Sequence, residues 1–158
     1  GPVGKGETGA MADGLTEGVL FLGTQPYPML LAKLAESDVL LHPSLEETFG
    51  MSIAEAMSLG LPVVGGQASG AVPWVIGEGG VVVDVTSVEA IESALVHLLS
   101  DAGVYHCHSK AARARAHAQF GAAQVVDAYE ATYSNALHRV SAANAASRDG
   151  VFRSMGKI

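Results

Sequence analysis

The stretch over residues 38–66, DVLLHPSLEETFGMSIAEAMSLGLPVVGG, decides the fold. It begins with one short apolar run at 39–41 and ends with another at 62–64. Such runs, bounded by Gly or Pro, are typical of strands that are buried on both faces of a parallel sheet. Residues 51–59 between them have a helix-forming composition, and Gly60 is well placed to end the helix. The stretch therefore predicts a strand-helix-strand unit.

The same alternation continues on both sides of this unit. We expect strands near 18–23, 38–42, 62–65 and 80–84, and helices over 29–37, 51–59, 87–99, 104–118 and 122–140. Strands that alternate with helices at short spacing form parallel sheets with right-handed crossovers. The sequence therefore predicts an α/β fold, a Rossmann-like parallel sheet of four strands flanked by helices.

The length of 158 residues suits one domain with one substantial core. Residues 1–17 are rich in Gly and predict an N-terminal loop, and residues 18–140 form the predicted domain. From 141 to 158 the apolar periodicity is lost, which predicts a frayed tail.

Composition excludes several classes of function. The net charge of -7 disfavours broad binding to nucleic acid or anionic membranes. A single cysteine, Cys107, allows no disulfide within the chain and fits a reducing compartment. Its neighbours His106 and His108 would not share a helical face, so a structural or surface role is favoured over a metal site. No apolar run reaches the roughly 20 residues of a membrane span, and no secretory signal is evident. We expect a cytoplasmic protein.

Two segments at predicted strand ends have the composition of a ligand site, because ligands of open parallel sheets bind at the carboxyl ends of strands. In the segment over 42–55, a helix starts near Gly50 and offers unpaired N–H groups to a phosphate, while Glu47 and Glu55 could accept from hydroxyls. The segment over 65–74 has three glycines in six residues. Both have structural alternatives: Ser52 and Glu55 match a capping box, and Gly-rich loops occur without ligands.

The residues 47–57, ETFGMSIAEAM, resemble the Glu-x7-Glu signature of retaining GT-B glycosyltransferases, in particular glycosyltransferase family 4. Four further segments match the same pattern in the same order: 21–23, 42–44, 60–64 with the glycine-rich loop, and 81–84. The resemblance covers roughly residues 18 to 135. An isolated Glu-x7-Glu is a weak signal, whereas the ordered set is specific.

The resemblance implies the C-terminal, donor-binding domain of a GT-B enzyme. Such an enzyme transfers a sugar from a UDP-, GDP- or ADP-sugar to an acceptor hydroxyl with retention and without a metal. By the same resemblance, the catalytic carboxylate would be Glu47, which contacts donor-sugar hydroxyls, and Glu55 would bind the ribose. The donor-sugar and phosphate contacts would come from Thr48, Phe49, Gly50 and Met51, and the base would lie near Gly23, Thr24 and Gln25.

Two departures from the family pattern limit this expectation. Trp74 stands where the family commonly has Glu, and could serve packing or stacking. The chain also has no room for the two βα units that carry an Arg and a Lys against the diphosphate, or for the acceptor-binding N-terminal lobe. We therefore expect the isolated chain to be inactive and to have that lobe as its partner. The lobe could also associate the protein with a membrane. We further expect the isolated chain to self-associate, unless its ends cover the exposed apolar surface. The alternative is a non-catalytic nucleotide-binding or assembly module.

Overall fold

The computed structural model describes residues 17–155, and side chains as far as 140. Its strands are β1 (Leu40–His42), β2 (Val63–Gly66) and β3 (Gly80–Val83). Its helices are α2 (Tyr27–Ala35), α3 (Met51–Leu59), α4 (Val72–Ile76), α5 (Val88–Ser100), α6 (Ala102–Phe120) and α7 (Ala122–Met155). The predicted N-terminal loop lies outside the described residues except for Glu17.

The three strands form a parallel sheet in the order β1-β2-β3. Leu40 is paired with Val63, and Val64 with Val81. All four residues of the central strand β2 are buried. The predicted Rossmann-like parallel sheet flanked by helices is therefore confirmed, with short apolar strands at its centre.

The fourth predicted strand, over 18–23, is wrong: in the described chain this segment has no strand conformation. Val19 is 51% exposed and Leu20 is 80% exposed. A strand needs a neighbour to accept and donate its backbone hydrogen bonds. Among the described residues the open edge of β1 stays unpaired, because the segment over 18–23 does not pair with it, so the apolar run alone does not produce a strand.

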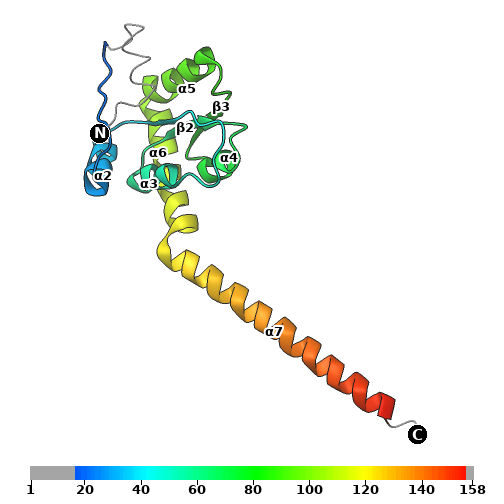
Figure 1. The fold of residues 1–158 in the computed structure, drawn as a ribbon. Helices are drawn as coiled ribbons and strands as arrows, with labels where there is room; N and C mark the ends of the chain where they lie inside the picture. The colour runs from blue at the N-terminus through cyan, green and yellow to red at the C-terminus, as the bar shows by residue number, and fades with distance from the viewer. Residues whose placement is uncertain (1–16, 156–158) are drawn as a thin grey trace.

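The core lies on both faces of β2 because successive side chains of a strand point to opposite sides. Val63 packs with Ile53 and Met57 of α3, in a cluster that α4 and α6 complete. Val64 packs on the other face with Ala94 and Leu98 of α5. Figure 1 shows the helices α3, α4, α5 and α6 gathered around the strands, with α2 to one side.

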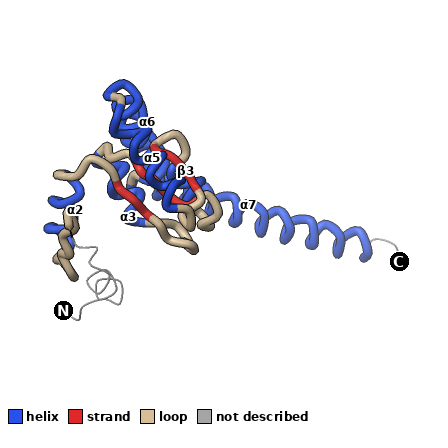
Figure 2. Tube along the Cα trace, turned by 90° about the horizontal axis from the view of Figure 1, so that it is seen from above, coloured by secondary structure: helices blue, strands red, loops and turns tan. Residues whose placement is uncertain are grey.

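The last helix departs from this layered arrangement. Gly121 takes φ -64° and ψ 146°, which ends α6, and α7 then projects away from the domain (Figures 1 and 2). The sequence predicted a helix over 122–140, whereas α7 extends to Met155. The extension follows an alanine-rich stretch, because Ala favours helix without any apolar periodicity. Fraying of 141–158 stays a prediction. No helix in the described part of the chain has the length and apolarity needed to cross a membrane.

Candidate functional site

Glu47 lies in the loop between β1 and α3, where the chain leaves the carboxyl end of the first strand. Its Oε1 accepts hydrogen bonds from the backbone N–H groups of Thr48 at 3.0 Å and Phe49 at 3.4 Å. Its Oε2 lies 3.5 Å from Nε2 of His42, the last residue of β1. The carboxylate is thus held by its own loop and faces a histidine.

His42 is a residue to which the sequence pattern assigned no role. Its Nε2 is buried and has no hydrogen-bond partner among the described atoms. A buried polar nitrogen without a partner is uncommon in folded proteins. Its position as the final residue of a predicted parallel strand was the signal that could have identified it.

The start of α3 depends on Gly50. This residue takes φ 89° and ψ 63°, a left-handed conformation that favours glycine. A Cβ there would lie 2.9 Å from Cδ1 of Ile53. No side chain caps the helix, so its first N–H groups and the positive end of the dipole remain open to an anion.

Glu55 does not act in a capping box. Its Oε1 accepts a hydrogen bond of 2.9 Å from the hydroxyl of Tyr27, the first residue of α2. This hydrogen bond, with smaller contributions from desolvation and from the carboxylate charge, raises the pKa of Tyr27. The hydroxyl therefore stays a proton donor toward Glu55.

The glycine-rich segment packs directly against the Glu47 loop. The N–H of Ala71 donates to the carbonyl of Glu47 at 3.1 Å, and the hydroxyl of Ser69 donates to the carbonyl of Ser44. Gly70 has φ 55°, and a Cβ there would overlap the carbonyl oxygen of Glu47. The structure thus brings the two predicted segments together, and close backbone approach accounts for Gly70.

Trp74 serves packing in α4, a short helix that the sequence did not predict. Its ring centroid lies 6.3 Å from that of Phe49 and 5.6 Å from that of Phe120. The guanidinium of Arg115 lies 5.9 Å from the ring and donates to the carbonyl of Val75 at 2.9 Å. Because Trp74 is still 57% exposed, the aromatic cluster keeps one open side.

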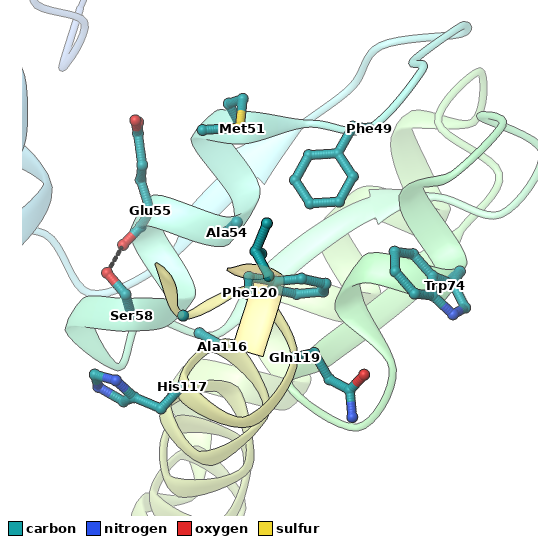
Figure 3. A pocket seen from close by; sticks show the side chains of 12 residues that line it. Phe49, Met51, Ala54, Glu55, Ser58, Trp74, Ala116, His117, Gln119 and Phe120 are labelled. Atoms are coloured by element: carbon teal, nitrogen blue, oxygen red, sulfur yellow. Dashed lines mark hydrogen bonds between the residues drawn. The ribbon is translucent and has the colours of Figure 1, made fainter. Parts of the chain in front are cut away.

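A cavity of about 530 Å³ lies beside these aromatic residues, between α3, α4 and the junction of α6 with α7. Figure 3 shows Phe49, Trp74 and Phe120 close together, and the carboxylate of Glu55 pointing away from them. Three predicted site residues, Phe49, Met51 and Glu55, line this cavity. Its volume falls in the range typical of small-molecule sites.

The segment predicted to lie near the base leads directly into α2. Gly23 and Thr24 are exposed, and the side-chain amide of Gln25 donates to the carbonyl of Leu22. Two residues further on, Tyr27 reaches Glu55. The predicted roles of Gly23, Thr24 and Gln25 stay predictions, as do those of Glu47 to Met51 and of Glu55.

The two arginines of α6 are used in packing. Arg113 donates to the carbonyl of Leu59 at the end of α3 at 2.7 Å, and Arg115 donates to α4. A cation at a helix C-terminus complements the dipole. These two residues therefore support helix ends instead of facing the start of α3.

Comparisons with known proteins show which family this sequence resembles. The family described as glycosyl transferases group 1 matches residues 2–101. N-acetyl-alpha-D-glucosaminyl L-malate synthase of Bacillus anthracis is 34% identical over 121 residues, which cover 75% of this chain and 31% of the relative. O-antigen chain mannosyltransferase B of Escherichia coli is 37% identical over 89 residues, 56% of this chain and 23% of the relative. The chain therefore spans less than a third of either relative.

The fold is also shared with a solved structure. Sucrose-phosphate synthase from Thermosynechococcus elongatus superimposes with a TM-score of 0.68 at 24% identity, over 82% of this chain and 34% of that one. This similarity supports the GT-B, Rossmann-like fold. Because the family pattern matches well over half of the residues, the chain belongs to the glycosyl transferases group 1 family of glycosyltransferases.

Proposed function

We propose that this chain binds the nucleoside-diphosphate sugar for a retaining glycosyltransferase of family 4. The observation that carries the proposal is the uncapped start of α3, which Gly50 opens and which Glu47 and Glu55 flank. Helix starts of this kind bind phosphate, and carboxylates accept hydrogen bonds from sugar hydroxyls. A ligand that carries both groups matches the site.

In the proposed reaction the bond between the anomeric carbon and the diphosphate oxygen breaks, and a bond from that carbon to the acceptor oxygen forms. The acceptor hydroxyl loses its proton, and the diphosphate leaves. Glu47 would hold the donor-sugar hydroxyls, and its two backbone hydrogen bonds fix its orientation. The N–H groups of Gly50 and Met51 and the dipole of α3 would stabilise the charge that develops on the diphosphate. No metal is part of this proposal.

A thermal-shift screen over UDP-, GDP- and ADP-sugars tests the proposal. One of them, at 100 times its dissociation constant, should stabilise the chain by about 2.7 kcal/mol. Glu47→Gln should weaken the response, whereas Glu46→Gln, an exposed neighbour, should not. Failure of all three ligands to stabilise the chain would contradict the proposal.

Turnover would also need a second lobe that binds the acceptor. The relatives in which this region occurs are more than three times as long as the matched part of the chain. We propose that the 158-residue chain alone transfers no sugar. Turnover of a nucleotide sugar by the purified chain would refute this proposal. If the chain binds nucleotide but a protein that also contains the second lobe transfers no sugar, the alternative of a non-catalytic nucleotide-binding module would be favoured.

Self-association is a further part of the proposal. The α7 stripe, defined as Val126, Tyr129, Tyr133, Leu137 and Val140, has every member more than half exposed. The spacing of three, four, four and three residues reads the same in both directions about Tyr133. A two-fold interface requires such a self-complementary surface. An antiparallel pair of α7 helices would match Val126 with Val140 and Tyr129 with Leu137.

A further inference from the structure

The contact between Tyr27 and Glu55 is not explained by core packing. Tyr27 is 57% exposed, and its ring lies outside the buried clusters of the described domain. Its hydroxyl nevertheless donates to Glu55 Oε1 at 2.9 Å, across 28 positions of the chain. Pro26 and Pro28 flank it at the start of α2, and proline fixes φ on either side of the residue. The chain is thus stiff where it presents this hydroxyl.

The contact leaves half of the carboxylate available. A carboxylate only accepts, and its two oxygens have room for about four hydrogen bonds. Glu55 Oε1 holds the Tyr27 hydroxyl, while Oε2 receives no hydrogen bond from any described group of the chain. Glu55 is half-buried and lies at the edge of the cavity, and its carboxylate points away from Phe49 (Figure 3). One oxygen is therefore fixed and the other is presented to a ligand.

We infer that Tyr27 is a positioning residue for ribose recognition: its hydroxyl orients Glu55 so that Oε2 accepts a hydrogen bond from a ribose hydroxyl. This inference rests on the proposed function, because it assumes that a nucleotide occupies the site. Tyr27 is the first residue of α2 and directly follows the segment over 23–26. It therefore links the part of the chain expected near the base to Glu55, which is expected at the ribose. The Tyr27 hydroxyl is protonated through the neutral range, because the ordinary pKa of Tyr is about 10 and the hydrogen bond to Glu55 raises the pKa of Tyr27 further.

A purely structural role would give a different result. If the hydrogen bond only joined α2 to α3, its loss would weaken the binding of every nucleotide to the same extent. If Tyr27 positions Glu55, its loss should reduce the discrimination between a ribonucleotide and its deoxy counterpart. Without Tyr27 the Glu55 carboxylate is mobile, and the hydrogen bond that it accepts from the ribose hydroxyl is weakened. The ratio of the two affinities therefore separates the two roles.

The experiment measures the binding of UDP, GDP, ADP and their 2′-deoxy counterparts to the full chain. Fluorescence of Trp74, the single tryptophan, provides the signal beside the cavity. For the nucleotide that binds best, we expect the wild-type chain to prefer the ribo form by about tenfold, as for a hydrogen bond to a charged group. Tyr27→Phe should reduce this preference to about twofold, and Glu55→Ala, which removes the acceptor, should abolish it.

Tyr105→Phe is the matched control, because the Tyr105 hydroxyl also makes a long-range hydrogen bond, to the carbonyl of Asp38 at 3.0 Å, away from the cavity. It should leave the preference at its wild-type value. A Tyr27→Phe chain that keeps the full preference, or that loses affinity for both forms equally, would overturn the inference and leave the proposed function intact. If none of the nucleotides binds to the wild-type chain, the proposed function itself fails.

Discussion

The helices α3 and α7 carry apolar residues at helical spacing, but only α3 is packed. Four of the nine residues of α3 are buried, among them Ile53 and Met57. The helix α7 has 34 residues, and every side chain described in it is exposed. Most of the stability of a helix in a protein comes from the face it buries. Periodicity therefore identifies a helix, while the partner on which the helix packs determines what each residue contributes to stability.

The largest effect should separate the two helices directly. Met57→Ala removes a side chain that is fully buried between α3, β2 and α6, and should lower the free energy of unfolding by about 2–5 kcal/mol. Leu137→Ala in α7 removes a side chain that is 69% exposed in the single chain, and should change it by less than about 0.5 kcal/mol at a protein concentration low enough to keep the chain monomeric. Urea unfolding at equal protein concentration measures both. Equal losses would break the comparison.

The two ends of α3 offer the next test, because both are glycines with φ 89°. A side chain in this left-handed region costs about 1–2 kcal/mol, so Gly50→Ala and Gly60→Ala should both destabilise the chain by roughly that amount. Only Gly50 lies at the proposed phosphate site. Gly50→Ala should therefore also weaken nucleotide binding at least tenfold, while Gly60→Ala should not.

This pair of glycines is informative because it separates strain from function. Urea unfolding measures the loss of stability caused by backbone strain. Titration with the best-binding nucleotide, at a temperature at which each variant is folded, measures the loss of binding. If Gly60→Ala impaired binding as much as Gly50→Ala, general distortion of α3 would explain both, and the start of the helix would lose its proposed role.

Much of the packed region could be predicted from the sequence. The runs at 39–41, 62–64 and 81–83 gave parallel strands, and the bounds of α3 were correct. These elements are specified locally, by an apolar run and a glycine stop. The run at 18–23 has the same local pattern but does not pair with the open edge of β1, and the sequence of one segment carries no information about its partner.

The candidate site shows the same division. A helix start near Gly50, after a strand and with Glu47 and Glu55 on either side, was predicted, and the structure has the start of α3 at Gly50. The Tyr27 contact was not predictable, because Ser52 and Glu55 offered a local capping box and the true partner lies 28 residues away. The short helix α4 was also missed, since its two glycine-rich flanks indicated only a loop.

A smaller effect should come from the α7 stripe. Tyr133→Asp places a charge at the centre of the stripe and should weaken self-association at least tenfold, because a buried unpaired charge is costly. Ser134→Asp adds the same charge one position along the helix, off the stripe, and should leave association nearly unchanged. Sedimentation equilibrium at tens of micromolar measures both. A wild-type chain that is monomeric throughout would refute the two-fold pairing and favour the second lobe as the partner of α7.

The smallest effect should lie within the packed domain, at the turn that follows β3. Asp84 Oδ1 accepts hydrogen bonds from the N–H of Thr86 at 2.9 Å and from its hydroxyl at 2.6 Å, and these bonds lower the pKa of Asp84. Both residues are exposed, so water competes for each bond. If burial determines how much a substitution destabilises the chain, Thr86→Val should lower the free energy of unfolding only slightly, even though Thr86 lies in the same domain as Met57.

The sign of the pH dependence makes this small effect measurable. A carboxyl group whose folded pKa is lowered stabilises the fold above its unfolded pKa, about 3.9 for Asp, and loses that contribution as the pH falls through the folded value. Thr86→Val removes the hydroxyl and keeps the N–H, so the pKa of Asp84 should rise part of the way toward its ordinary value. The wild-type chain should then unfold at a slightly higher temperature than Thr86→Val at neutral pH, and part of this difference should disappear in acid. A loss as large as that of Met57→Ala, at any pH, would show that position in the domain matters more than burial and would undo the contrast between α3 and α7.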